Sequence, residues 1–315
     1  MLSPLSPDAP PPAKGSSAAI ERGFDAHDWL LIGLMSVTWG LNVIAIKFAL
    51  QLTSPLTAAF LRQAIVALLC LPFLRLVSGR MLWVCIYAVL AGALFYIPIN
   101  LALAVSDNVG ALVIASQLGA PFAVLLSVFF LGETIRLPRI LGLFLAFSGV
   151  MLVGFDPAVV HELPGLVLMA LSSLLWAIGS LMTRQMADVR VSTLFAWLGL
   201  AGVCILGPVA ATFEPDAFNL ITAMPWQVWT WIGFSAIGST IIGHGSLSLL
   251  VQRHPIGTVM PYTLIAPILS VIVASVIFDT TITGMMMLGG VFVLVGVAVI
   301  TIRTANRGQM IETPS

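Results

Sequence analysis

Ten long apolar segments follow one another along the chain, and short polar connections separate them. A helix needs about 20 apolar residues to cross the ~30 Å hydrocarbon core of a bilayer. The segments are continuous rather than alternating, and helices satisfy their own backbone polar groups where lipid offers no partners. We therefore predict an all-α integral membrane protein with ten transmembrane helices, at 29–50, 55–74, 81–104, 109–131, 137–155, 164–184, 192–212, 226–250, 256–278 and 283–303.

Basic residues occupy alternate connections between these segments, and the other connections contain acidic residues only. The acidic set is Asp107, Asp156, Glu162, Glu214, Asp216 and Asp279, and the basic set is Lys14, Arg22, Arg75, Arg80, Arg136, Arg139, Arg184, Arg190, Arg253, Arg303 and Arg307. Short loops rich in Lys and Arg stay in the cytoplasm. This pattern predicts a multi-pass protein of the bacterial inner membrane with both termini in the cytoplasm.

The two halves of the chain resemble each other. Ser-x-x-Trp occurs around Trp39 in the first segment and around Trp176 in the sixth, and a basic residue, Lys47 or Arg184, follows each Trp eight positions later. Further matches pair Ala120-Pro121 with Ala266-Pro267, and the glycines Gly142 and Gly149 with Gly289 and Gly296. Each repeat has five segments, an odd number, so the second enters from the opposite face. We predict two inverted repeats, at 29–155 and 164–303.

The composition agrees with a protein that lies mostly in lipid. It is 59% hydrophobic and 8% charged, whereas soluble domains are about 25% charged. The net charge of zero gives no sign of nucleic-acid binding. Residues 1–28 are rich in Pro, Ser and Ala and are expected to form a disordered cytoplasmic tail. Residues 304–315 are expected to form a second cytoplasmic tail.

Few ionisable groups lie inside the predicted segments, and such groups are usually functional. Lys47 and Arg62 have no acidic partner at their depth, and we expect them to attract the carboxylate of an amino-acid-like substrate. For Lys47 the alternative is that its amine reaches the outer surface. Asn42, Asn100 and Gln117 lie at similar depth, and they either line a cavity or join helices.

Aromatic and histidine side chains complete the candidate cavity. Trp39 and Trp176 lie mid-membrane, where core packing is the alternative to facing a polar cavity. His244, flanked by glycines, is the candidate proton carrier because imidazole titrates near neutral pH, although a lone histidine more often makes a structural hydrogen bond. Tyr262 lies at comparable depth and is its expected partner. The full candidate set is Trp39, Asn42, Lys47, Arg62, Asn100, Gln117, Trp176, His244 and Tyr262.

Prolines and glycines in the predicted segments indicate where helices bend and where they pack closely. Pro121, Pro261 and Pro267 in the fourth and ninth segments predict hinges or kinks, since proline cannot donate a helical hydrogen bond. The glycine faces of the fifth and tenth segments, made by Gly142, Gly149, Gly289 and Gly296, allow close helix contact. We interpret these two segments as packing scaffolds within the chain or in a homodimer, not as cavity walls.

No enzyme, cofactor or metal motif is found. HExxH, a phosphate-binding glycine loop and clustered metal ligands are all absent from the sequence. The three cysteines, Cys70, Cys85 and Cys204, lie in apolar segments without CxxC spacing and are interpreted as small buried hydrophobic residues. The expected partners are therefore a small-molecule substrate and the bilayer.

With these motifs the chain resembles EamA-type members of the drug/metabolite transporter superfamily, over about residues 29 to 303. The similar stretches are WGLNVIAIKFAL, Arg62, Gln117, LGETIRLPRILGLFLAFSGV and MPYTLIAP, and they are similar to the branch that includes the bacterial O-acetylserine/cysteine exporter. The resemblance implies ten helices and transport, mostly export, of amino acids and other small metabolites. His244 and the FDTT sequence at Asp279 depart from the pattern of that branch.

The hypothesis from the sequence is an exporter of amino acids or their derivatives that works by alternating access, with proton antiport as the coupling. An uncoupled facilitator and an importer of another small metabolite are alternatives. A non-transporting membrane sensor or assembly protein is the alternative from another class, but the sequence has no soluble output domain for such a role.

Overall fold

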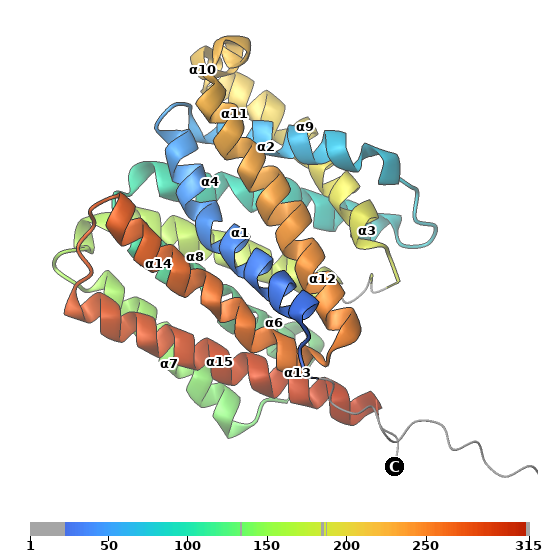
Figure 1. The fold of residues 1–315 in the computed structure, drawn as a ribbon, viewed down its shortest axis with the longest axis vertical. Helices are drawn as coiled ribbons and strands as arrows, with labels where there is room; N and C mark the ends of the chain where they lie inside the picture. The colour runs from blue at the N-terminus through green and yellow to red at the C-terminus, as the bar shows by residue number, and fades with distance from the viewer. Residues whose placement is uncertain (1–22, 133, 184–185, 187, 313–315) are drawn as a thin grey trace, which may run out of the picture.

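A computed structural model describes residues 23–312, apart from 133, 184, 185 and 187. Within these residues every regular element is a helix, and ten of the helical stretches are long and apolar enough to cross a membrane (Figure 1). They coincide with the ten predicted segments to within a few residues at each end. The predicted fold class is therefore confirmed.

The first repeat consists of α1 (Ala26–Leu50), α2 (Pro55–Cys70) with η1 (Leu71–Phe73), α3 (Met81–Val89), η2 (Leu90–Leu94) and α4 (Tyr96–Val105), α5 (Val109–Ser116) and α6 (Gly119–Leu131), and α7 (Leu137–Gly154). The second consists of η3 (Val160–Glu162) and α8 (Leu163–Thr183), α9 (Val191–Phe213), α10 (Pro215–Asn219), η5 (Ile221–Ala223), α11 (Trp226–Gly233), η6 (Phe234–Gly243) and α12 (His244–Arg253), α13 (Ile256–Val259), η7 (Met260–Leu264) and α14 (Ile265–Ile277), and α15 (Gly284–Glu312).

Helices cover part of both predicted tails. A capping box between Asp25 and Asp28 starts α1 at Ala26, because side-chain oxygens satisfy the free backbone N–H groups of a first turn. The expected tail therefore ends before this helix, and its residues 1–22 lie outside the described part. At the other terminus α15 continues to Glu312, since the residues after 303 include good helix formers such as Ala305 and Gln309.

The two repeats are inverted, and the contact between α7 and α15 shows it. A Cβ built on Gly296 would lie 2.6 Å from the carbonyl oxygen of Gly142, and one on Gly289 would lie 2.6 Å from that of Gly149. Moving seven residues forward along α7, from Gly142 to Gly149, thus moves the contact seven residues backward along α15. The fifth and tenth spans are antiparallel, as opposite insertion of the repeats requires. Close backbone contact at small residues is typical of membrane helices.

Other helix pairs follow the same approximate two-fold relationship. α1 packs on α14 and on η6, while its counterpart α8 packs on α6 and on η2. α2 packs on α9, its own counterpart. Each repeat therefore supplies one wall of a shared interior rather than forming a separate bundle (Figure 1).

Helical hydrogen bonding is interrupted at matched places in the two repeats. The fourth span breaks at Gln117 and Leu118, between α5 and α6, and the ninth contains the 3₁₀ stretch η7 before α14. The third and eighth spans contain π-helical stretches, η2 and η6. Such interruptions in soluble and membrane helices often mark functional sites.

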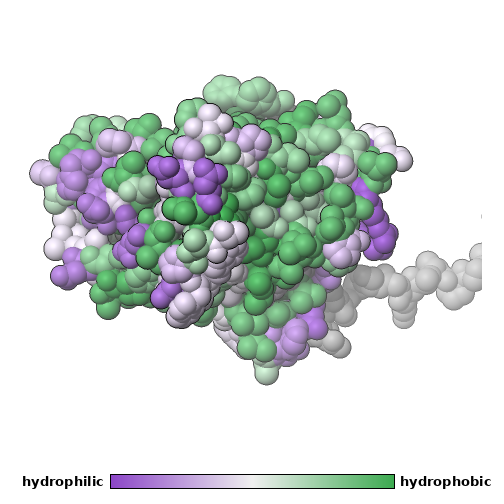
Figure 2. All heavy atoms as spheres, turned by 90° about the horizontal axis from the view of Figure 1, so that it is seen from above, coloured by the Kyte–Doolittle hydropathy of each residue, from purple (hydrophilic) through white to green (hydrophobic). Residues whose placement is uncertain are grey.

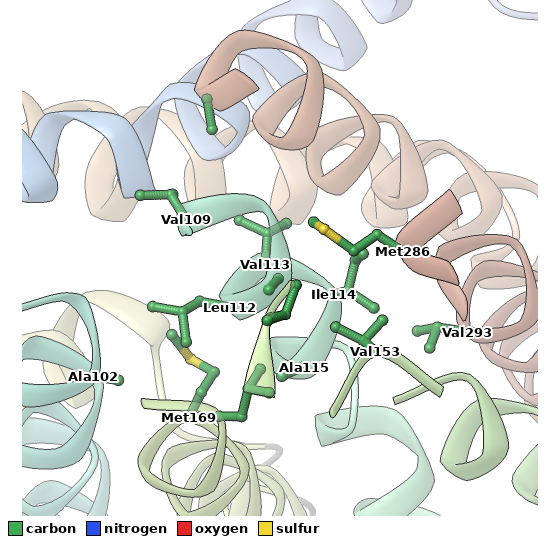
Figure 3. Close-up of a cluster of buried hydrophobic side chains, with 14 of the residues drawn as sticks. Ala102, Val109, Leu112, Val113, Ile114, Ala115, Val153, Met169, Met286 and Val293 are labelled. Carbon is green, nitrogen blue, oxygen red and sulfur yellow. The ribbon is translucent and has the colours of Figure 1, made fainter. Parts of the chain in front are cut away.

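A buried apolar cluster fills one half of the space between the repeats. It lies around α5 and the ends of α1 and α4, and Figure 3 shows Leu112 toward Met169 on one side of it and Ile114 toward Met286 on the other. We call this half the Lys47 end, where α1 ends, and the other half the Asp28 end, where α1 begins.

The surface is largely apolar, as contact with lipid requires. Phe129, Phe144 and Val276 are among the most exposed side chains, and the face in Figure 2 is mainly hydrophobic with hydrophilic residues in separate groups. The interpretation of all three cysteines as buried was wrong for Cys85 and Cys204, which are exposed. In lipid an apolar surface and an apolar core impose the same composition, so the sequence could not separate them.

Candidate functional site

A cavity of about 380 Å³ lies between the repeats, next to the apolar cluster. It extends from the middle of the bundle toward the Asp28 end, where Met260 and Thr301 border it. Its wall is made by Val43, Phe95, Ile99, Val113, Ser116, Gln117, Gly119, Ala120, Met169, Ser172, Ser173, Trp176, Met260, Thr263, Leu264, Val297 and Thr301.

Two of the predicted cavity residues, Gln117 and Trp176, line this cavity. Gln117 follows the last residue of α5, and its Nε2 donates to Ser116 Oγ at 3.2 Å. The indole of Trp176 is 47% exposed and lies against Gly119, where an added Cβ would be 2.9 Å from the ring. The glycine thus leaves room for the indole beside the break in the fourth span.

Arg62 lies outside this cavity wall, in a buried polar cluster of its own. Its side chain is 6% exposed, and its guanidinium donates to Ser235 Oγ at 2.9 Å and to Thr240 Oγ1 at 2.8 Å, both in η6. It also donates to Gln63 and lies 4.4 Å from the centre of the Tyr96 ring. All of these partners are neutral.

Trp39 and His244 also converge on η6. The indole N–H of Trp39 donates to the carbonyl oxygen of Ser239 at 3.1 Å, and Nδ1 of His244 lies 2.9 Å from the same oxygen. The two rings meet edge to face, 4.9 Å apart. Gly243 makes this approach possible, since an added Cβ would collide with the Trp39 indole.

Lys47 has a structural partner. Its Nζ donates to the carbonyl oxygens of Leu103, at 2.9 Å, and Ser106, at 2.5 Å, where α4 ends. A cation at the C-terminus of a helix satisfies free carbonyls and opposes the helix dipole. The expected role of Lys47 in attracting substrate does not match this geometry. Its counterpart Arg184 lies outside the described residues.

Three other predicted residues are not on the cavity wall. Asn100 is buried, and its Nδ2 donates to the carbonyl oxygen of Tyr96 at 2.8 Å. Asn42 has a buried Oδ1 without a hydrogen-bond partner in the described structure. Tyr262 contacts Phe24 and Trp29 edge to face at the Asp28 end. The expected pairing of Tyr262 with His244 was wrong, because Tyr262 lies in η7, close to where the ninth span begins.

The predicted hinge prolines lie at the interruptions of their spans. Pro261 is inside η7, and Pro121 and Pro267 each follow a break by a few residues. Because proline has no N–H, the carbonyl four residues earlier loses its helical donor. Those carbonyls belong to Gln117 and Thr263, and both residues line the cavity.

Several residues of these sites were not found from the sequence. Gln63, Ser235 and Thr240 are buried around Arg62, and hydropathy gave no reason to single out hydroxyl residues in apolar segments. An amide beside Arg62 in an apolar segment could have pointed to this polar cluster, and that amide belongs to Gln63. Its Nε2 donates to the carbonyl oxygen of Gly92 in η2 at 2.6 Å.

A second missed group is Asp28 with His254 and Arg253, which the prediction placed outside the spans. Asp25, His27 and Asp28 are also close enough together to be considered as metal ligands. The carboxylates of Asp25 and Asp28 already cap the first turn of α1, and Asp28 accepts from Arg253 at 3.1 Å and lies 2.7 Å from His254 Nε2. This arrangement fits a structural contact better than a metal centre.

Known proteins resemble the chain over nearly its whole length. Its similarity to the probable amino-acid metabolite efflux pump of Escherichia coli K12 is 25% identity, covering 85% of this chain and 93% of that protein. An uncharacterized transporter of Archaeoglobus fulgidus is 24% identical, with coverage of 86% and 98%. A solved crystal structure of a protein aligns with a TM-score of 0.59 at 19% identity, covering 91% of this chain and all of that one, which shows a shared fold.

Both halves also match one family separately, at residues 29–155 and 163–302, and that family is described as EamA-like transporters. The match falls on the two inverted repeats around the cavity. The family description and the name of the Escherichia coli relative both indicate a small-molecule transporter and not an enzyme. The chain therefore belongs to the EamA-like transporter family.

Proposed function

We propose that this protein exports amino acids or related small metabolites across the bacterial inner membrane by alternating access. The observation that carries the proposal is the cavity between two inverted repeats, filled on one side by apolar packing and extending toward the other. An inverted repeat provides two related states, because each repeat can adopt the conformation of the other. The names of the relatives support small-molecule efflux.

The orientation follows from charge. With both termini in the cytoplasm, the basic connections lie inside, as short loops of this kind do. The acidic residues of the other side then have a structural use. Glu214 accepts from the backbone N–H groups of Leu56 and Thr57 where α2 begins, and Glu162 accepts from that of Asn108 where α5 begins. Carboxylates stabilise helix N-termini.

In this orientation we infer an inward-facing state. The apolar cluster closes the outer, Lys47 half, and the cavity reaches toward the inner, Asp28 half. Cargo shifts the balance between the two states only through its different affinity for each of them.

Arg62 is the proposed partner of the cargo carboxylate. A buried guanidinium surrounded by neutral groups is costly, and a carboxylate would supply the missing charge through a two-pronged hydrogen bond. Its donors Nε and Nη2 now bind hydroxyls of η6. We propose that these hydroxyls give way to the cargo when η6 moves.

His244 is the proposed proton carrier for antiport. It lies 2.9 Å from the Ser239 carbonyl, in the same helical stretch that binds Arg62. A change in its protonation would therefore act on the proposed carboxylate site. An uncoupled facilitator would need no such residue, and an importer would differ only in the direction of net flux.

The test is flux from liposomes that contain the purified protein, with a panel of labelled amino acids, with and without an imposed pH gradient. We expect saturable flux of at least one amino acid, stimulated when protons are supplied on the opposite side. His244→Gln should keep flux but lose the stimulation. Flux that ignores the gradient in the wild type supports the facilitator, and no flux of any amino acid contradicts the proposal and favours a sensor or assembly role.

A further inference from the structure

The polar groups of the central cavity are mainly hydrogen-bond acceptors. Ser116, Ser172, Ser173 and Thr263 are among its lining residues, and the hydroxyl of each donates its proton to a backbone carbonyl oxygen, at 2.7 to 3.2 Å. A hydroxyl has one proton to donate but two lone pairs. Ser172 and Ser173 are buried, so Ser116 and Thr263 are the two hydroxyl residues that can offer a ligand their oxygen lone pairs.

The remaining groups strengthen this bias. Gln117 uses one amide N–H on Ser116 and keeps its side-chain oxygen as an acceptor. The backbone carbonyls of Gln117 and Thr263 lack their helical donors because prolines follow four residues later. Among the described side chains on the wall, the indole N–H of Trp176, the Thr301 hydroxyl and the second Gln117 N–H are the donors without a recorded acceptor.

The wall has no charged side chain among its described residues. A carboxylate would find few donors in this cavity and no counter-charge. An ammonium group would find several oxygen acceptors, and Trp176, a half-exposed wall residue, supplies an aromatic ring of the kind that attracts cations. The chemistry of the wall thus favours a cationic ligand over an anionic one.

We propose that this cavity is the subsite for the ammonium group of the cargo, with Trp176 and the oxygens around Gln117 as its ligands. The inference rests on the proposed function and completes it, because the carboxylate is assigned to Arg62. Phe95 lines the cavity and the next residue, Tyr96, lies under the Arg62 guanidinium, and the inference requires the two places to come within the length of one amino acid when η6 moves. A zwitterionic amino acid satisfies both, whereas a simple anion satisfies only Arg62.

Two probes separate the charges, butylammonium and butyrate, each titrated into the purified full-length protein at constant ionic strength. Binding is followed by the shift in melting temperature, since a ligand of the folded state raises it. We expect butylammonium to bind saturably and Trp176→Leu to weaken it by about threefold or more, the order expected for a cation on an aromatic face. Trp176→Phe, which keeps a ring, should retain most of the binding.

Trp226→Leu is the matched control, because Trp226 is an exposed tryptophan at the start of α11, away from the cavity wall. Gln117→Lys places a cation in the subsite and should abolish butylammonium binding, whereas butyrate binding should be insensitive to Trp176→Leu. The melting temperature of each variant without ligand shows whether it has folded.

Butylammonium that fails to bind the wild type, or binds Trp176→Leu as well as the wild type, overturns the inference. The liposome assay distinguishes this result from failure of the proposed function. Amino-acid flux without Trp176-dependent butylammonium binding overturns the ammonium subsite alone. No amino-acid flux overturns the proposed function, while Trp176-dependent binding would still support an amine site.

Discussion

Nε2 of His254 lies 2.7 Å from the Asp28 carboxylate, and this contact joins the first turn of α1 to the residue that follows α12. Asp28 is 3% exposed and also accepts from Arg253. Phe24 packs on the His254 ring with a centroid distance of 4.6 Å. In the proposed orientation, this is the main polar contact between α1 and the eighth span at the cytoplasmic end.

Replacing Asp28 with Asn should therefore destabilise the folded protein. The variant loses the negative charge that binds Arg253 and His254. A hydrogen bond to a charged group contributes about 1.5–3 kcal/mol to the stability of a folded protein. We expect a loss of about 2 kcal/mol, measured by thermal or denaturant unfolding in detergent. Asp188→Asn is the control, since its contact with Arg80 is an exposed pair 4.0 Å apart and should change stability little.

Gly149→Ala should disrupt the packing of the fifth span on the tenth. Its new methyl group would collide with the carbonyl oxygen of Gly289 and with Val293, and backbone cannot move as freely as a side-chain end. We expect a loss of about 1–3 kcal/mol, the usual range for overpacking, measured as a lower melting temperature.

Gly245→Ala tests whether that loss arises from the contact. Gly245 is in α12 and has nothing within 4 Å of the position of its added Cβ. Alanine favours a helix over glycine by about 0.5–1 kcal/mol, so this variant should be as stable as the wild type or more so. Equal effects of the two substitutions would show that the α7–α15 contact is not the cause.

Lys47→Met should lower stability without changing the affinity for cargo. The variant keeps the length of the side chain but leaves the carbonyls of Leu103 and Ser106 without their donor, at a cost of about 1–3 kcal/mol. The measurements are the melting temperature and the KM for flux. A KM that rises severalfold at unchanged stability would instead place Lys47 in the cargo path.

Arg62→Gln should abolish flux of an amino acid, and Arg62→Lys should restore only part of it. Lysine keeps the charge but cannot form the planar, two-pronged contact with a carboxylate. Initial rates over a range of substrate concentrations are the measurement, with unfolding curves to show that each variant is folded. Wild-type rates in Arg62→Gln would remove Arg62 from the transport site.

The residues of the two repeats illustrate what could be predicted and what could not. Trp39 and Trp176 occupy equivalent positions in the sequence, yet Trp39 donates to Ser239 while Trp176 borders the cavity. Gln117 was found because amides are rare in apolar spans. Ser173 and Thr263 were missed because hydroxyls bond to their own helix and cost little in lipid, so their depth gives no signal.

The amino-acid sequence by itself determined the ten spans, their alternation and the relation between the halves, because hydrocarbon allows one kind of segment and positive charge stays on one side. The tertiary structure alone decided that Arg62 faces η6 rather than the cavity, that Lys47 binds the end of α4, and that His254 lies against Asp28. These partners come from segments far apart in the chain. Which of them meet depends on how the helices pack, and periodicity along one helix does not contain that information.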